Sequence, residues 1–137
     1  MKIRKTKMVV PDEETLKMIT GIENLEMFLE DDDQWMYHDS EIRNIHWDDK
    51  KRTLDVTVEP IGYSVEIDDA GCGKSFLLDF HFGNVESVCF DYSSYGYISE
   101  MEIKVENGFL VCTFDSYLLK VVAESLAVDP PRIVERN

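Results

Sequence analysis

The residues best suited to chemistry lie close together in one short stretch: His38, Asp39, Glu41, His46 and Asp48. Histidine nitrogens and carboxylate oxygens are common zinc ligands, and they also act as general acids and bases. In a strand, alternation places His46 and Asp48 on one face, which would supply two ligands. A catalytic zinc site needs a third ligand, for which His38, Asp39 or His81 would serve. One hypothesis is therefore a small metal-dependent enzyme that uses His38, His46 and Asp48.

The same stretch also has a purely structural interpretation. His38-Asp39 would form the turn before a strand, with Asp39 or Ser40 accepting hydrogen bonds from nearby backbone N–H groups. His46 would then lie on the surface. We favour this interpretation because the sequence contains no Cys-x-x-Cys or His-x-x-x-His pair, the spacings typical of metal sites. It predicts no metal site, no cofactor and no catalytic residue.

A glycine-rich segment at residues 71–75 (GCGKS) resembles the end of a phosphate-binding loop. A complete loop of that kind has a further glycine five positions before Gly73, where this chain has Asp68. Asp68 and Asp69 would repel a phosphate, and a strand pattern follows where the phosphate-binding helix should begin. The segment therefore predicts a surface loop and no nucleotide site.

Three tyrosines stand among serine and glycine residues: Tyr92, Tyr95 and Tyr97. Tyrosine provides rigid, amphipathic contact area at protein interfaces, and serine and glycine are its adaptable neighbours in binding loops. The alternative is a hairpin turn whose tyrosines pack on the sheet. The sequence leaves both interpretations open.

Period-two alternation makes strands the main expected structure. Two sets of apolar residues share a strand face: Phe76, Leu78, Phe80 and Phe82, and then Met101, Ile103 and Val105. Charged residues occupy the opposite face of the second set, which is typical of antiparallel sheets. Asn107-Gly108 predicts a type I′ turn that pairs residues 98–106 with 109–115. Gly83-Asn84 predicts a turn between two separate strands.

Residues 117–128 fit either a strand or a helix. As a strand, the segment aligns Leu119, Val121 and Ala123 on one face. As a helix, it aligns Leu118, Val121, Val122 and Ser125. We favour the strand because the paired valines and the neighbouring hairpin suit a sheet.

The other elements follow from pattern. Acidic residues after Pro11 and an apolar stripe at helical spacing predict a helix over 12–30, either kinked at Gly21 or divided there. A turn at 48–51 joins expected strands at 42–47 and 53–59. Further expected segments are a basic stretch at 1–10, a short strand through Tyr63, Val65 and Ile67, a β region spanning 41–128, and a tail at 132–137.

Together these elements predict an α+β fold that is mainly antiparallel β. We expect about seven or eight strands in a curved or two-layer sheet, with one N-terminal helical segment. The 137 residues show no internal repeat and no linker, so a single domain over 1–137 is expected.

Charge is the strongest feature of the composition. The chain has 28 Asp and Glu against 14 Lys and Arg, a formal net charge of −14. Nucleic acids and anionic membranes are bound through cations, so neither is an expected partner. A basic protein would be attracted, and its association would be accelerated. The alternative is that the charge serves solubility alone.

Cysteine usage indicates a reducing, cytoplasmic location. The three cysteines, Cys72, Cys89 and Cys112, are scattered and odd in number. Cys72 falls in an expected exposed loop, whereas Cys89 and Cys112 fall within strand patterns, where a reduced cysteine behaves as a small apolar residue.

Two short motifs carry a family resemblance. YHDSEI at residues 37–42 leads into the first hairpin, and an aliphatic strand ends in AESLAV at residues 123–128. Over residues 35–128 this layout resembles small β-rich bacterial immunity proteins, which are encoded beside polymorphic toxins. The resemblance implies a non-enzymatic, cytoplasmic protein that binds and blocks a cognate toxin domain.

We therefore expect a binding protein that masks a basic partner. Its expected contact surface combines tyrosines with carboxylates: Tyr92, Tyr95, Tyr97, Asp91, Asp31, Asp32, Asp33, Asp68 and Asp69. The alternatives are the metal-dependent enzyme and a structural domain that self-associates through an exposed strand edge.

Overall fold

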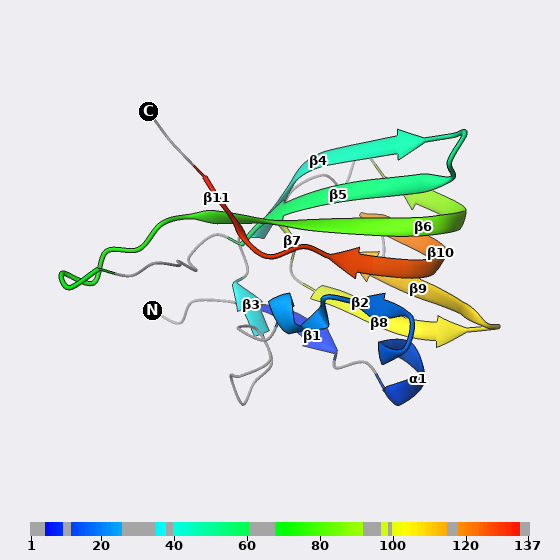
Figure 1. Ribbon diagram of the computed structural model, residues 1–137, viewed down its shortest axis with the longest axis horizontal. Helices are drawn as coiled ribbons and strands as arrows, with labels where there is room; N and C mark the ends of the chain where they lie inside the picture. The colour runs from blue at the N-terminus through cyan, green and yellow to red at the C-terminus, as the bar shows by residue number, and fades with distance from the viewer. Residues whose placement is uncertain are drawn as a thin grey trace.

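Strands, mainly antiparallel as expected, account for most of the described residues, and one short helix lies near the N-terminus (Figure 1). The computed structural model describes residues 5–9, 12–25, 35–37, 40–60, 68–91, 97–98, 100–114 and 118–134. The longer strands are β1 (Lys5–Val9), β4 (Ser40–Asp48), β5 (Thr53–Glu59), β6 (Phe76–Phe90), β8 (Glu100–Glu106), β9 (Phe109–Phe114) and β10 (Leu119–Val128). The shorter strands are β2 (Ile19–Thr20), β3 (Trp35–Tyr37), β7 (Tyr97–Ile98) and β11 (Arg132–Ile133).

The strands pair in one continuous order whose last strand, β7, directly precedes β8 in the chain. The order along the sheet is β3-β1-β8-β9-β10-β6-β5-β4-β7. β7 pairs with the first residues of β4, Ser40 and Glu41, and β8 begins two residues after β7 ends. The sheet therefore curves until β4 lies against β7, in the same stretch of chain that continues as β8. Figure 1 shows this curve, from β4 at the top through β6 and β10 to β8 at the bottom.

The expected hairpins are present in the expected registers. β8 pairs with β9 around Asn107-Gly108, whose positive φ values of 52° and 82° confirm the predicted type of turn. β4 pairs with β5, and Asp48 accepts hydrogen bonds from the backbone N–H groups of Lys50 and Lys51 at 3.0 and 3.1 Å. The segment from Leu119 to Val128 is a strand, so the strand interpretation of residues 117–128 is correct for the part that the structure describes.

The turn predicted at Gly83-Asn84 is wrong, because β6 runs through these residues as one strand of fifteen residues. The two residues bend the strand without ending it. Asn84 has φ of 48°, and the pairing register with β10 shifts nearby, between Val122 and Ala123. A Cβ atom on Gly83 would lie 2.6 Å from the Ser125 side-chain oxygen of β10, a contact that rotation of the serine side chain would relieve. Glycine and asparagine favour a bend in a strand as readily as a turn.

The hydrophobic core fills the inside of the curved sheet. The predicted face of β6 is fully buried, with Phe76, Leu78, Phe80 and Phe82 each 1% exposed or less. Phe80 packs edge-on against Phe114 of β9, with ring centroids 5.9 Å apart. Cys112 is also buried, and burial raises the pKa of its thiol. Cys89 is exposed instead of buried, because β6 loses its cover beyond the bend.

The helix expected over 12–30 is much shorter than predicted. Asp12 caps it as the sequence indicates, accepting a 2.8 Å hydrogen bond from the Thr15 N–H, and this bond lowers the pKa of Asp12. The α-helix α1 (Glu13–Leu16) then gives way to β2, which pairs in parallel with β10. The 3₁₀ helix η1 (Ile22–Leu25) follows, and residues 26–30 lie outside the described chain.

Backbone pairing and glycine geometry explain this early end. Gly21 has φ of +81°, and its Cα approaches the Val128 carbonyl oxygen so closely that a Cβ would collide with it. The Asn24 side chain donates a 2.8 Å hydrogen bond to the same oxygen. Met18 and Ile22 still pack against the core, as the apolar stripe predicted. Among the described residues, no helix has the length and apolar character needed to cross a membrane.

The close contact at Gly21 makes a testable prediction with a matched control at Gly71. Both glycines have positive φ, but a Cβ at Gly71 would meet nothing within 4 Å. Gly71→Ala should therefore cost only the strain of the left-handed backbone, about 1 kcal/mol. Gly21→Ala adds a backbone collision and should lower the free energy of unfolding by more than about 2 kcal/mol. Urea unfolding measures both, and equal losses would contradict the packing described at Val128.

Candidate functional site

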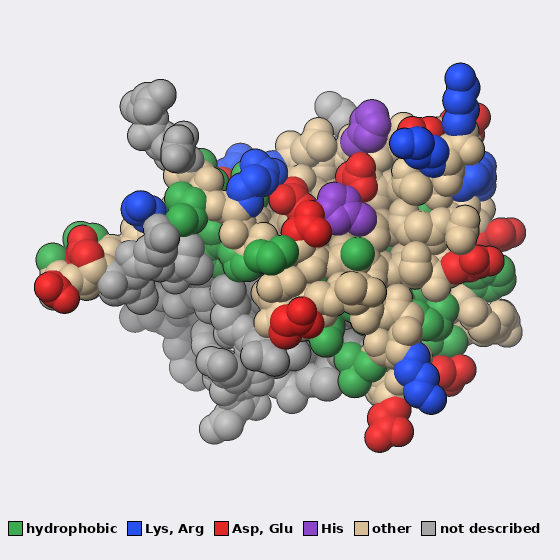
Figure 2. All heavy atoms as spheres, in the orientation of Figure 1, with side chains coloured by type: hydrophobic (Ala, Val, Ile, Leu, Met, Phe, Trp, Pro, Cys, Tyr) green, Lys and Arg blue, Asp and Glu red, His purple; other side chains and the backbone are tan. Residues whose placement is uncertain are grey.

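One row of polar side chains crosses three neighbouring strands on the outer face of the sheet. The pairing registers place His46 of β4 opposite Asp55 of β5, and Asp55 opposite His81 of β6. Directly opposed residues of antiparallel strands point to the same face, so these three side chains share the solvent side. Figure 2 shows histidine and acidic side chains gathered over this face.

His81 forms the centre of this row. Its Nδ1 lies 2.7 Å from Asp55 Oδ1, and its Nε2 lies 2.7 Å from Asp129 Oδ2. Asp129 follows the end of β10, so the contact joins β5, β6 and the start of the C-terminal segment. Carboxylates only accept hydrogen bonds, and both contacts are therefore hydrogen bonds only when both ring nitrogens carry a proton. The arrangement favours an imidazolium held between two carboxylates.

Electrostatics agree with this protonation state. Partial burial by itself would lower the pKa of His81, but hydrogen bonds and charge attraction from Asp55 and Asp129 outweigh burial, so its pKa is raised above 6.5. A histidine that already holds both protons has no free lone pair with which to take another. This geometry suits an ion-pair clamp better than a general base.

A second ion pair lies beside the first. Arg132 of β11 donates to Asp79 of β6 through both Nε and a terminal nitrogen, each at 3.1 Å. The Thr57 hydroxyl of β5 donates to the same carboxylate at 2.7 Å. These contacts, the Arg132 bonds first, lower the pKa of Asp79. The Asp129 N–H also donates to the Asp79 carbonyl at 3.1 Å.

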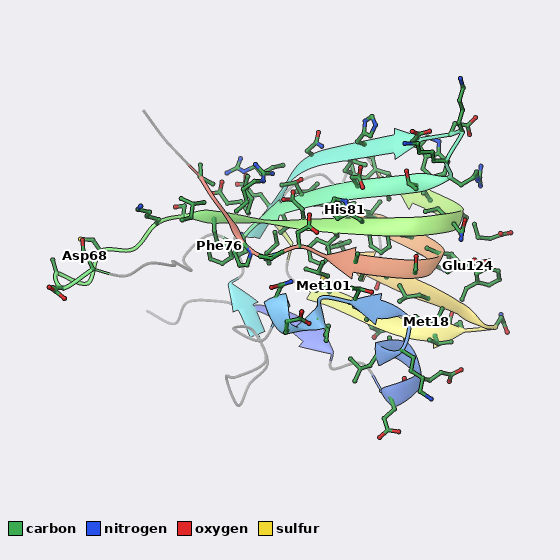
Figure 3. The ribbon with its side chains drawn as sticks, viewed as in Figure 1. Met18, Asp68, Phe76, His81, Met101 and Glu124 are labelled. Carbon is green, nitrogen blue, oxygen red and sulfur yellow. The ribbon has the colours of Figure 1, made fainter. Side chains whose placement is uncertain are left out.

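The two ion pairs hold the C-terminal segment against β6. After β10 ends, the chain continues along the same side of β6, where Arg132 pairs with Leu77 and Ile133 with Phe76. β11 has only two residues, and backbone hydrogen bonds from the Asp129 N–H to Asp79 and from the Val134 N–H to Ser75 extend its pairing on either side. The side-chain contacts of Asp129 and Arg132 add to this attachment. We refer to Asp55, His81, Asp129, Asp79 and Arg132 together as the C-terminal clamp (Figure 3 labels His81).

The structure describes only some of the residues proposed as metal ligands. His38 and Asp39 lie outside the described residues. His46 is exposed, and Asp48 accepts the turn hydrogen bonds described above. Both nitrogens of His81 are occupied by carboxylates. Within the described chain, no three His, Cys, Asp or Glu side chains converge in a way that would hold a metal ion.

Most of the expected contact surface falls outside the described residues, namely Asp31, Asp32, Asp33, Tyr92 and Tyr95. Tyr97 is described for its backbone, which pairs with Glu41 of β4. Asp91 is exposed directly after β6, and its N–H donates to the Leu118 carbonyl at 3.0 Å.

The loop at residues 68–75 carries the remaining two expected carboxylates. Asp68 and Asp69 are both exposed, and Figure 3 places Asp68 at the tip of a loop that projects from the start of β6. The Asp68 carboxylate accepts hydrogen bonds from the N–H groups of Ala70 and Cys72, each at 2.9 Å. Phe76 begins β6 directly after the loop, so a strand follows the GCGKS segment as predicted. Asp68 therefore shapes the loop, and Asp69 is exposed beside it.

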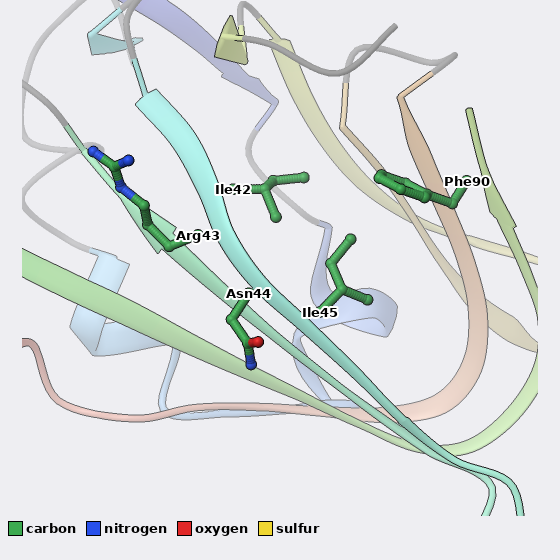
Figure 4. A pocket seen from close by; sticks show the side chains of 5 residues that line it. All are labelled: Ile42, Arg43, Asn44, Ile45 and Phe90. Carbon is green, nitrogen blue, oxygen red and sulfur yellow. The ribbon is translucent and has the colours of Figure 1, made fainter. Parts of the chain in front are cut away.

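A shallow pocket lies on the inner side of β4. Its volume is about 230 Å³, and its lining residues are Ile42, Arg43, Asn44, Ile45 and Phe90. Ile42 and Ile45 project towards Phe90 from across the gap (Figure 4). The register of β4 shifts at Arg43, so this bulge turns Ile42 and Ile45 onto one face although they are three residues apart.

Sequence patterns did not reveal the clamp. Asp55, Asp79, Asp129 and Arg132 are separated by up to 77 residues, and no local spacing links them. The pairing of His46 with Asp55 follows from the predicted hairpin, which was the one available signal. The contacts of His81 depend on β6 lying between β5 and β10, which is a property of the tertiary fold.

Comparison with known proteins yields no match of any kind: no family model, no curated protein and no solved structure is similar to this chain.

The clamp predicts a raised pKa for His81, measurable by NMR titration of its ring resonances. The folded pKa should lie above 6.5, and Asp55→Asn or Asp129→Asn should each lower it. Because the folded pKa is raised, the stabilisation by His81 is complete below about pH 6.5 and is lost as the pH rises through the folded value. A His81 pKa below 6.5 in the wild type would contradict the two-carboxylate geometry.

The ion pair of Arg132 and Asp79 predicts how the stability of the protein changes at acidic pH. The lowered pKa of Asp79 means that its stabilisation is present above about pH 3.8 and is lost as the pH falls through the folded value. Arg132→Met should destabilise the protein by about 1 kcal/mol at neutral pH, since the guanidinium is largely exposed. A double-mutant cycle with Asp79→Asn isolates the pair, and a coupling energy of zero would show that the contact contributes nothing.

Proposed function

We propose that this protein is a non-catalytic binding protein of the immunity type, which neutralises a basic toxin domain by covering it. The observation that carries the proposal is the net charge of −14. A field of that size attracts a basic partner over a distance of about 10 Å at moderate salt and repels other acidic surfaces. The family resemblance over residues 35–128 supports the same role.

The position of the described carboxylates supports this proposal. Asp68 and Asp69 project on a loop, and Asp91 is exposed at the end of β6. None of these three takes part in the C-terminal clamp. Together with Tyr92, Tyr95 and Tyr97 and the acidic run at 31–33, they form the contact surface that we propose.

The size of the pocket on β4 also suits a binding protein. Sites for small molecules usually enclose about 300 to 1,000 Å³ and bury most of the ligand. The pocket of about 230 Å³ is open and has room for one side chain of a protein partner. Contact with a macromolecule therefore fits the described surface better than capture of a substrate.

The test is a titration against the purified toxin domain encoded by the adjacent gene. We expect a one-to-one complex whose Kd rises by about tenfold or more between low and moderate salt, because screening weakens charge attraction. Calorimetry measures the affinity, and survival of cells that express the toxin domain measures neutralisation. Absence of binding at low salt, or a neighbouring gene that encodes no toxin, would overturn the proposal.

Variants locate the contact surface. Tyr95→Ala with Asp91→Ala should weaken binding by about tenfold or more, as expected for residues inside an interface, and Asp68→Asn with Asp69→Asn should act in the same direction. Glu13→Gln with Glu14→Gln removes two exposed charges from α1 and is the matched control. If the control weakens binding as much as the test variants, net charge alone drives association and the proposed surface is wrong.

A further inference from the structure

The outer edge of β4 carries backbone groups that no described strand meets. β7 pairs only with Ser40 and Glu41 at the beginning of β4, whereas β5 pairs along the opposite side. Strands in an antiparallel sheet direct alternate N–H and C=O groups towards each edge. Within the described chain, residues 44–48 therefore present donors and acceptors outward over about half the length of β4. An edge of this kind is a template for adding another strand.

Apolar side chains flank this edge. Ile45 is partly buried against the core, and Trp47 is 37% exposed. The Arg52 guanidinium lies over the Trp47 ring at 5.1 Å and covers one of its faces. Natural edge strands are usually protected from pairing with other chains by lysine, by proline or by a charge that points inward. Residues 44–48 (NIHWD) contain neither lysine nor proline.

Charge distinguishes this edge from the rest of the protein. Residues 40–59, which form the β4–β5 hairpin, contain five of the 28 acidic residues and four of the 14 basic residues. The hairpin is thus nearly neutral, whereas the remainder of the chain carries almost all of the net charge. A second copy of so acidic a chain meets least repulsion if it approaches at this hairpin.

We infer that the chain forms a two-fold symmetric dimer in which residues 44–48 of β4 pair antiparallel with the same residues of a second copy. In a two-fold symmetric pair of antiparallel strands, opposed residues point to the same face of the sheet. One residue therefore lies on the axis, opposite the same residue of the partner subunit. With His46 on the axis, Ile45 lies opposite Trp47 of the partner subunit, and the same contact repeats by symmetry. Asn44 then lies opposite Asp48 of the partner subunit, which pairs an amide donor with a carboxylate.

This dimer does not rest on the proposed function. The C-terminal clamp and the loop at 68–75 lie on other elements, so both copies keep those acidic groups exposed, whereas Tyr97 and the pocket lined by Asn44 and Ile45 adjoin the dimer contact. Five residues a side make a small interface, and we expect a Kd on the order of micromolar. Salt should tighten the dimer, since it screens the repulsion between two chains of −14. Binding of a basic partner should instead weaken with salt.

Sedimentation equilibrium of the full chain alone, from about 10 to about 500 µM, measures the dimer without any partner. Trp47→Glu places a carboxylate opposite an isoleucine while keeping a counter-ion in Arg52, and it should raise the dimer Kd by about tenfold or more. Leu16→Glu is the matched control, because Leu16 is 38% exposed on α1, away from this edge. The inference would be overturned if the wild type stayed monomeric over the whole concentration range. It would also be overturned if Leu16→Glu raised the dimer Kd as much as Trp47→Glu.

Disulfide formation tests the position of the axis. In a chain with Cys72→Ser and Cys89→Ser, His46→Cys places one thiol opposite its symmetry mate, and mild oxidation should give a covalent dimer. Lys120→Cys is the control, an exposed residue of β10 that pairs with Thr113 of β9 on one side and with residue 89 of β6 on the other. Crosslinking of His46→Cys no faster than that of Lys120→Cys would overturn the proposed register.

Discussion

The bend in β6 is the constraint on which the rest of the structure depends. This strand pairs with β5 before the bend and with β10 along most of its length, so it must change direction without losing its partners. Asn84 makes the change with a positive φ of 48°, close to the point where the pairing register with β10 shifts. The bend carries the second half of β6 around the core and allows the sheet to close.

Several features follow from that one strand. Before the bend, β6 places four apolar residues in the core and directs Asp79 and His81 outward. After the bend, it brings Phe90 to the pocket opposite Ile42 and Ile45. The C-terminal clamp forms because β5 and the end of β10 lie on either side of His81. An imidazolium between two carboxylates, beside a bidentate arginine–aspartate pair, reinforces the short backbone pairing of this segment.

The distribution of charge separates two parts of the surface. Carboxylates of the clamp are balanced by His81 and Arg132, whereas Asp68, Asp69 and Asp91 are exposed outside it. The β4–β5 hairpin is nearly neutral and has an edge open to pairing. The loop at 68–75 and the β4–β5 hairpin therefore differ in the electrostatic attraction and repulsion that they exert.

Local sequence determined the strands and their hairpins, because alternation, capping and turn residues act over a few positions. Asn107-Gly108, the buried face of β6 and the cap at Asp12 were all predictable on that basis. The early end of α1 and the bend at Gly83-Asn84 were not, since each depends on a contact with β10 more than 40 residues away. Asp55, His81 and Asp129 meet only because β6 lies between β5 and β10, and the open edge exists only because β7 pairs with so little of β4. Strand order is decided by the packing of the whole core, and that packing has no signature in any short stretch of the chain.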